Sequence, residues 1–224
     1  MKAKLTLLCL GLVAISMAGQ NTVRFTRHQA VGDHDTFKIS ITGTAQMGDM
    51  DINLTETRTV KKVYDNGDAD VETATTELKV SMGGNDFPVP LPPPTTIKMD
   101  KNGVPIGEQK GPGSGMNFSK YAAAFYDRDL KVGDTINVDQ ASPDGKEKTT
   151  GTVKLDSVAN GEAKLTADLV TTLPDLDGPA KLHMDMFMDT ASSKPNRMEA
   201  TVSSMPLRQG MVLNNVKMTY ERVK

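Results

Sequence analysis

The stretch AKLHMDMFMD, from Ala180 to Asp189, alternates apolar and polar side chains with a period of two. Successive side chains of a β-strand point to opposite faces, so Met184, Met186 and Met188 share one face of such a strand. The opposite face carries the histidine and the aspartates. The pattern therefore predicts an antiparallel strand with one buried face and one wet face.

The same alternation recurs in several other runs of the chain. These are residues 37–41, 50–54, 78–82, 163–169, 198–202 and 216–220. Asn-Gly pairs, the strongest short hairpin signal, lie between such runs at Asn66-Gly67, Asn102-Gly103 and Asn160-Gly161. We therefore predict a mainly β protein with minor α+β character. Its curved antiparallel sheet should form an open or half barrel of roughly 10–12 strands.

A short helix is expected near the middle of the chain, at about residues 116–126. Phe118, Tyr121 and Phe125 fall at the i, i+3 and i+7 positions of one helical face. This segment is rich in the scarce aromatic residues, so we expect it to pack on the sheet as a plug. The Pro-rich stretch 87–94 should run as extended, polyproline-like chain.

An internal echo divides the chain into two similar halves. Val31-Gly32-Asp33 precedes the Asn66-Gly67 turn, and Val132-Gly133-Asp134 precedes the Asn160-Gly161 turn. Duplication and the chance recurrence of common hairpin sequences both explain this order. Neither half closes a core alone, so we expect a single β domain over residues 19–224. Its segments are the first half at about 22–110, the helix at about 116–126 and the second half at about 128–224.

Residues 1–18 have the features of a secretory signal peptide. Lys2 and Lys4 precede an apolar run at residues 5–15, and Ser16-Met17-Ala18 supplies the small residues that a signal peptidase reads. The run is too short to span a bilayer. We therefore expect a secreted or periplasmic bacterial protein. Cys9, the only cysteine, lies inside the apolar run rather than after it, so no lipoprotein anchor is expected.

Composition excludes several classes of function. The sequence carries 26 Lys and Arg against 28 Asp and Glu, which leaves no basic excess for binding nucleic acid. No apolar run beyond the leader approaches the ~20 residues of a membrane helix, so no transmembrane segment is expected in the mature chain. Without Cys9, the mature chain has no thiol for disulfides, thiolate zinc sites or cysteine nucleophiles. We expect no cofactor.

Two clusters have metal-ligand character, and each has a simpler interpretation. His28 with Asp33-His34-Asp35 could suit a divalent ion, but the spacing matches no known site and indicates a solvated loop. Met184, Met186 and Met188 carry soft ligands for Cu(I), yet they lie too far apart on one strand to bind one ion together. No metal site is therefore predicted. The chain has no Gly-x-Ser-x-Gly motif and only 3 His, so we assign no catalytic residue and expect no enzyme.

Short motifs along the chain resemble those of a known group of proteins. Leu130–Asp134 places Val-Gly-Asp after the central helix, and Asp100–Val104 reads Asp-Lys-Asn-Gly-Val. In these motifs the sequence resembles exported bacterial β-proteins of unknown function. Its architecture resembles the envelope lipoprotein-carrier superfamily, an open β-barrel whose curved sheet wraps short helices. The resemblance implies an apolar cavity and no catalytic residues.

The leading functional hypothesis is an exported, non-catalytic envelope protein that binds an amphiphilic or apolar ligand, such as a lipid, between sheet and helix. The candidate cavity lining comprises Phe118, Tyr121, Phe125, Met184, Met186 and Met188. The alternative is a structural or protein-interaction module with a packed core. Its polar strand faces and Pro-rich segment would meet an envelope protein partner. A third hypothesis is a hydrolase of unrecognised type.

Overall fold

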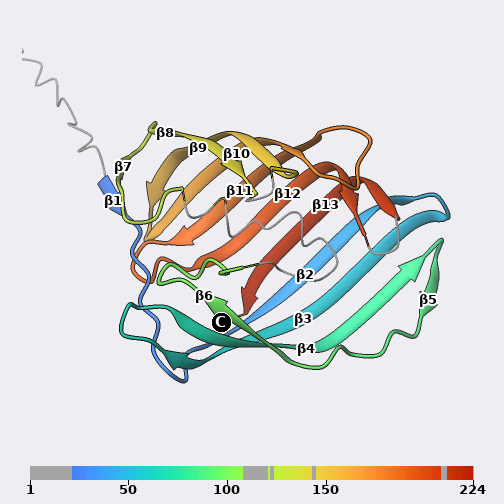
Figure 1. Cartoon of the computed structure of the whole chain (residues 1–224), viewed down its shortest axis with the longest axis horizontal. Helices are drawn as coiled ribbons and strands as arrows, with labels where there is room; N and C mark the ends of the chain where they lie inside the picture. Colours follow the sequence, from blue (N-terminus) through green and yellow to red (C-terminus); the bar gives the residue numbers. More distant parts are fainter. Residues whose placement is uncertain (1–21, 108–120, 122–123, 143–144, 208–210, 224) are drawn as a thin grey trace, which may run out of the picture.

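Figure 1 shows the computed structural model, which describes residues 22–107, 121, 124–142, 145–207 and 211–223. Every named element within these ranges is a β-strand, and none of the described residues belongs to a helix long and apolar enough to cross a membrane. The strands are β1 (Thr22–Arg24), β2 (His34–Ala45), β3 (Gly48–Val63), β4 (Ala69–Met82), β5 (Asn85–Phe87), β6 (Thr95–Met99), β7 (Asp129–Lys131), β8 (Thr135–Ala141), β9 (Lys148–Ala159), β10 (Glu162–Thr172), β11 (Ala180–Asp189), β12 (Pro195–Pro206) and β13 (Val212–Val223).

The strands form one large antiparallel sheet and one small sheet. The large sheet has 11 strands. Ten follow the order β5-β4-β3-β2-β13-β12-β11-β10-β9-β8, and the eleventh, β6, pairs with β4. Two meanders, β2 to β4 and β8 to β13, are joined where β2 pairs with β13. The outermost strands do not pair with each other, so the curved sheet stays open (Figure 1). The prediction of a mainly β, open, curved antiparallel sheet is confirmed.

Turn residues set the register of the hairpins where the sequence places Asn-Gly. Between β9 and β10, Asn160 and Gly161 have φ angles of 53° and 79°, the type I′ geometry that matches the twist of paired strands. Asn66-Gly67 turns the chain between β3 and β4, where the N–H of Gly67 donates to the carbonyl oxygen of Tyr64 at 2.9 Å. Two of the three predicted hairpins are confirmed. At the third, Asn102-Gly103, the N–H of Gly103 donates to the carbonyl oxygen of Asp100 at 2.9 Å in a turn flanked only by an isolated bridge between Met99 and Pro105.

The two Val-Gly-Asp motifs form the same turn in both halves of the chain. Asp33 Oδ2 accepts from the N–H of Ala30 at 3.0 Å, and Asp134 Oδ2 accepts from the N–H of Lys131 at 2.8 Å. The glycines have φ angles of 90° and 97°, and their N–H groups donate to carbonyl oxygens of β3 and β9. The echo in the sequence is therefore a repeated structural turn, and duplication stays a hypothesis for its origin.

Side chains on the concave face form rows that run across neighbouring strands. One such row consists of Leu155, Leu165, Met186, Met198, Tyr220, Ile39, Leu54 and Leu78. Its members on β9 to β13 are buried, whereas those on β2, β3 and β4 are half-buried. The core is therefore complete over β9–β13 and thinner over β2–β4.

The N-terminal segment (residues 22–33) runs along one end of the strands (Figure 1). Its apolar side chains and those of the chain that leads into β7 are buried in one cluster with the concave face of β9–β13, and we call these two segments the cover. Phe25 and Phe125 are fully buried and meet edge to face, with ring centroids 5.3 Å apart. β1 pairs with β7 in the small sheet, which fixes these two segments to each other. Tyr121 and Phe125 of the predicted plug belong to this cover and are buried in the same core cluster as the sheet.

Among the described residues of the predicted helix at about 116–126, only Tyr121 has helical conformation. Phe118 and most of the predicted range lie outside the described residues. At the described end of the range, Ala124 and Phe125 form a turn and Tyr126 pairs with Phe25 in an isolated β-bridge. A single apolar turn has little helical stability of its own, so tertiary contacts decide its backbone conformation. The hydroxyl of Tyr126 is held by the loop between β11 and β12.

Candidate functional site

The concave face over β2, β3 and β4 carries half-buried aliphatic side chains. We call this set the aliphatic strip; its residues are Ile39, Ile41, Ile52, Leu54, Leu78 and Val80. They form two adjacent cross-strand rows, one through Ile39 and one through Ile41. Large aliphatic side chains are usually buried, so a contiguous set that keeps accessible surface marks a place where a partner molecule could complete the core.

The same face turns polar toward one end of these strands. We call this region the polar end; its residues are Asp35, Glu56, Arg58, Thr73, Lys194 and Arg222. Asp35, Arg58 and Thr73 lie directly opposite one another on β2, β3 and β4. A molecule lying along the strands would therefore contact apolar side chains over its length and charged side chains at one end.

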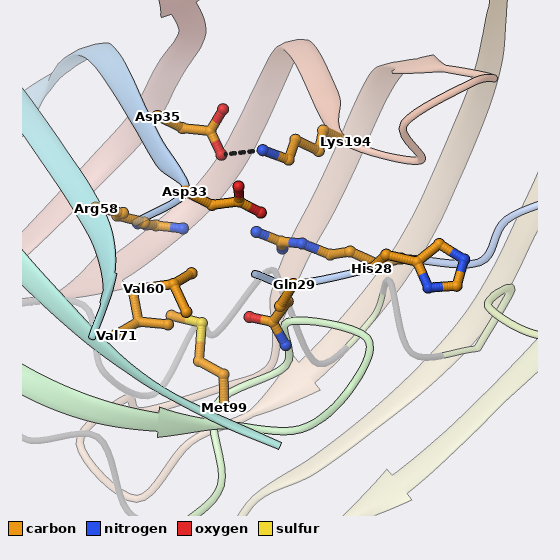
Figure 2. A pocket seen from close by; sticks show the side chains of 10 residues that line it. His28, Gln29, Asp33, Asp35, Arg58, Val60, Val71, Met99 and Lys194 are labelled. Atoms are coloured by element: carbon orange, nitrogen blue, oxygen red, sulfur yellow. Dashed lines mark hydrogen bonds and ion pairs between the residues drawn. The ribbon is translucent and has the colours of Figure 1, made fainter. Parts of the chain in front are cut away.

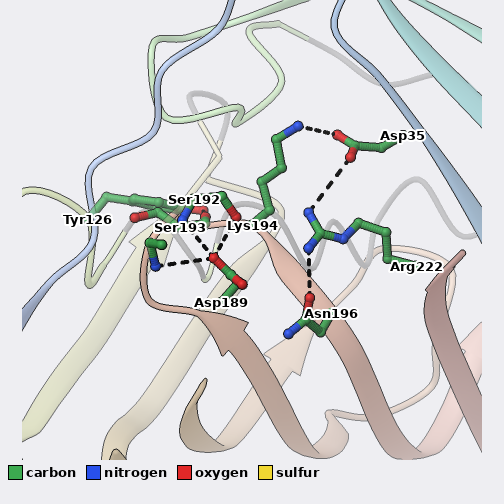
Figure 3. Close-up of polar contacts among 9 residues, drawn as sticks. Asp35, Tyr126, Asp189, Ser192, Ser193, Lys194, Asn196 and Arg222 are labelled. Atoms are coloured by element: carbon green, nitrogen blue, oxygen red, sulfur yellow. Dashed lines mark hydrogen bonds and ion pairs between the residues drawn. The ribbon is translucent and has the colours of Figure 1, made fainter. Parts of the chain in front are cut away.

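Lys194 and Arg222 pair with the carboxylate of Asp35 (Figure 3). Nζ of Lys194 lies 2.8 Å from Asp35 Oδ2, and Nη1 of Arg222 lies 3.7 Å from Asp35 Oδ1. These side chains are at most 17% exposed, and Arg222 Nη2 also donates to Asn196 Oδ1 at 2.7 Å. Because a buried charge without a partner is costly, these contacts hold the β11–β12 loop against β2.

Arg58 is held between a carboxylate and two aromatic rings. Its Nε donates to Glu56 Oε1 at 2.7 Å, and its guanidinium carbon lies 5.2 Å from the Phe37 ring centroid and 5.9 Å from that of Tyr220. Burial opposes the charge, but Tyr220 and Glu56 outweigh it, so the pKa of Arg58 is raised above its ordinary value. The side chain remains 31% exposed. The guanidinium is thus charged, oriented and accessible.

The loop between β11 and β12 forms hydrogen bonds to both segments of the cover, the N-terminal segment and the chain that leads into β7 (Figure 3). Ser193 is 2% exposed and has a φ of 54°, a left-handed conformation that is uncommon outside glycine. Its Oγ accepts from the N–H of Thr26, and its carbonyl oxygen accepts from the hydroxyl of Tyr126, both at 2.9 Å. Hydrogen bonds from Ser192 close the loop and lower the pKa of Asp189.

A small cavity lies beside the polar end (Figure 2). Its lining includes Arg27, Gln29, Arg58, Met99 and Lys194. The cavity volume of about 10 Å³ has room for one water molecule. Arg27 Nε and Gln29 Oε1 are buried and have no hydrogen-bond partner among the described residues. One water molecule can accept a hydrogen bond from Arg27 Nε and donate one to Gln29 Oε1. We therefore interpret the cavity as a site for a structural water molecule and not as a ligand site.

The predicted ligand-lining residues that the structure describes lie in the filled core. Met184, Met186 and Met188 are at most 4% exposed, which confirms that they share the buried face of β11. Tyr121 and Phe125 are buried in the same cluster. Their role in binding a ligand stays a prediction.

Neither the aliphatic strip nor the polar end is predicted by the sequence patterns described above. Ile39 and its neighbours alternate as clearly as the methionines of β11, so periodicity identifies the strand but not how completely it is covered. Asp35 and Lys194 are 159 residues apart, and no spacing rule finds such a pair. One signal was available: on β3, the aliphatic side of the strand continues directly into Glu56 and Arg58.

Histidines do not gather into a site in the part of the chain that the structure describes. His28 and His34 are exposed, and His183 Nδ1 lies 2.7 Å from Asp168 Oδ1 on the convex face. No three or more His, Cys, Asp or Glu side chains there are placed to hold a metal ion. The interpretation of Asp35 as part of a solvated loop is wrong, because β2 begins before it and two cations enclose its carboxylate.

Alkaline pH should destabilise the protein through two buried tyrosines. Burial raises the pKa of Tyr126 and of Tyr220 to about 12, from an ordinary value of 10.0. A raised folded-state pKa contributes stability that is complete below about pH 10 and is lost as the pH rises toward 12. Each tyrosine then contributes on the order of 2–3 kcal/mol. Urea unfolding at increasing pH should show this loss.

Tyr126→Phe is the control for the alkaline effect. The variant has no titratable group at this position, so it should lose less stability between pH 10 and 12 than the wild type. It should also be less stable at neutral pH by about 1–3 kcal/mol, because the buried carbonyl oxygen of Ser193 loses its donor. An identical pH profile for the two proteins would contradict the assignment to Tyr126.

The fold and the site together define an open, curved β-sheet protein whose concave face is only partly covered by the residues that the structure describes. No family model and no curated protein matches the sequence. Among solved structures, the chain is similar to DynF from the dynemicin biosynthesis pathway of Micromonospora chersina. The identity is 10% and the TM-score 0.24, over 91% of this chain and 86% of that chain. A likeness at this TM-score carries no inference about the function of this protein.

Proposed function

We propose that the protein is an exported, non-catalytic envelope protein that binds a single-chain amphiphile, such as a fatty acid, on the concave face of its sheet. The apolar chain of the ligand lies along the aliphatic strip, and its head group lies at the polar end. The leader-like sequence of residues 1–18 supports export. This proposal keeps the amphiphile expected from the sequence and moves its position from the methionine face to β2–β4.

One observation carries the proposal: burial changes along a single row of side chains. Leu165 and Met186 are at most 4% exposed, whereas Ile39, Leu54 and Leu78 in the same row are half-buried. Apolar surface left in water costs roughly 25 cal/mol per Å². A hydrocarbon chain on the strip would remove this surface from water and would extend the core across β2–β4.

Chain length should therefore control affinity. Each fully buried methylene contributes ~0.8 kcal/mol, and a chain that keeps one side in water gains about half of that. We expect affinity to rise about twofold per methylene from octanoate to decanoate and dodecanoate. Delipidated protein titrated with each by calorimetry, and by displacement of the dye N-phenylnaphthylamine, measures this dependence.

Leu54→Glu places a carboxylate in the middle of the strip and should weaken dodecanoate binding about tenfold or more. Asn53→Glu is the matched control, because it places the same side chain one residue away on the exposed, opposite face of β3. The control should bind as the wild type does. Equal losses in both variants, or no binding of any of the fatty acids by the delipidated protein, would contradict the proposal.

A protein-interaction module is the second candidate function. Phe87, Val89 and Leu91 are 49%, 40% and 51% exposed in a segment where they alternate with prolines. Extended proline-rich chain with exposed apolar side chains is the form that aromatic-lined grooves of partner proteins bind. Delipidated protein that binds no amphiphile would favour this candidate over the first.

A further inference from the structure

We infer that the head group of the ligand is an anion, a carboxylate or its equivalent, held by the guanidinium of Arg58 and the hydroxyl of Thr73. This inference rests on the proposed amphiphile function and names the chemical class of its ligand. It follows from the balance of hydrogen-bond donors and acceptors at the polar end.

The carboxylates of the polar end already have partners. Asp35 accepts from Lys194 and lies beside Arg222, and Glu56 accepts from Arg58. Nearby, Asp33 accepts from the N–H of Ala30. A cationic head group would compete with Lys194 and Arg222 for Asp35 and with Arg58 for Glu56.

The donors of the polar end are not all used. Among the described residues, Arg58 donates a hydrogen bond only through Nε, to Glu56. Its two Nη groups have no acceptor there. Thr73 Oγ1 is buried and has no hydrogen-bond partner there either. Arg58 and Thr73 face each other directly across β3 and β4. Two donor groups without acceptors thus lie side by side at the end of the aliphatic strip.

The unpaired Nη groups of Arg58 have the geometry for a carboxylate. A guanidinium presents its N–H groups in a planar fork that binds both oxygens of a carboxylate together. Glu56 occupies the Nε side, and the rings of Phe37 and Tyr220 flank the guanidinium, so its orientation is fixed before a ligand arrives. With 31% of its side chain exposed, Arg58 is not sealed from solvent.

Charges around Arg58 favour an anion over a neutral or cationic head group. Lys194 and Arg222 share the single carboxylate of Asp35, which leaves positive charge beside Arg58. Arg27 lines the same small cavity as Arg58 and has no ion-pair partner among the described residues. Around the polar end and the cavity, the four cations outnumber the three carboxylates by one. The cations are Arg27, Arg58, Lys194 and Arg222, and the carboxylates are Asp33, Asp35 and Glu56.

The chain direction follows from the register. Arg58, Glu56 and Leu54 lie on one face of β3, so a ligand with its head at Arg58 runs back over Leu54 to Ile52. The rise of a strand places Arg58 about 20 Å from Ile52. A single hydrocarbon chain can cover this distance, and a compact anion without a chain would contact only the head-group side.

The test compares three ligands that share one chain and differ in the charge of the head. Dodecanoate should bind the delipidated protein about tenfold more tightly than dodecanol, and dodecylamine should bind most weakly. Arg58→Met should remove the preference for dodecanoate while leaving dodecanol binding within about twofold. Calorimetric titration at one pH and one salt concentration measures all of these affinities.

Arg197→Met is the matched control variant. Arg197 also lies over an aromatic ring, with its guanidinium carbon 4.1 Å from the Phe187 centroid, but it is on the opposite face of the sheet. It should keep the full preference for dodecanoate. Thr73→Val removes only the orphan hydroxyl and should weaken dodecanoate binding a few-fold without changing dodecanol binding. This variant decides the question if Arg58→Met does not fold.

The possible outcomes separate the two proposals. Equal binding of dodecanoate and dodecanol, or a preference for dodecylamine, would overturn the anionic head group and leave the amphiphile function standing. A preference for dodecanoate that survives both Arg58→Met and Thr73→Val would overturn the assignment to these residues. Failure of all three ligands to bind would overturn the amphiphile function itself.

Discussion

Phe25→Ala should lower the free energy of unfolding by about 3–5 kcal/mol. Phe25 is 0% exposed, and its ring packs against that of Phe125. Its backbone forms a bridge to Tyr126, and the adjoining β1 pairs with β7. These contacts hold the surrounding chain in place, so it cannot collapse into the space that the ring leaves. Equilibrium urea unfolding of the variant and the wild type measures the difference.

Val31→Ala is the matched control for this experiment. It also removes apolar carbons from the N-terminal segment, but Val31 is 67% exposed. Its effect should stay below about 0.5 kcal/mol. If Phe25→Ala cost no more than this control, the N-terminal segment would not belong to the core, and the account of the covered concave face would fail.

Gly151→Ala should cost about 3–5 kcal/mol, because the added carbon has no room and the backbone has the wrong conformation for alanine. Gly151 has a φ of 145° within β9. A Cβ there would overlap the carbonyl oxygen of Asp168 and lie 2.9 Å from the Cα of Leu169 on β10. Both obstacles are backbone atoms of the paired strand, so the strands must separate to admit the side chain.

Gly133→Ala isolates the conformational part of that effect. Gly133 has a φ of 97°, and a Cβ built there would meet nothing within 4 Å. Only backbone strain opposes the substitution, which should therefore cost about 1–2 kcal/mol. Urea unfolding of both variants compares them directly. Equal effects would show that the contact with β10 does not matter.

Much of the sheet could be predicted from the sequence because its determinants are local. Period-two alternation assigns β11 a buried face through Met184 and Met186, and both are buried. The Asn160-Gly161 pair fixes a hairpin because positive φ angles at both residues are a property of those residues themselves. The approximate number of strands follows from counting such runs along the chain.

The chain around Tyr126 and the site could not be predicted because their determinants are not local. Phe125 has helical spacing from Tyr121, yet Phe25 and the β11–β12 loop hold the chain at Phe125 and Tyr126 in a non-helical conformation. The alternation at Ile39 shows which side is apolar but not whether anything covers it. That depends on a chain segment distant in sequence. The ion pairs of Asp35 likewise join strands that meet only in the finished sheet.

The pairing of β2 with β13 has a consequence for biosynthesis. Each meander can assemble from neighbouring hairpins as it is made, but the seam between the two meanders joins the first long strand to the last. Contacts of such high sequence separation form slowly, because closing so long a loop is entropically unfavourable. Until β13 is available, β2 offers a bare hydrogen-bonding edge beside apolar side chains. During that interval a chaperone can bind the exposed edge of β2, and two nascent copies can exchange strands with each other.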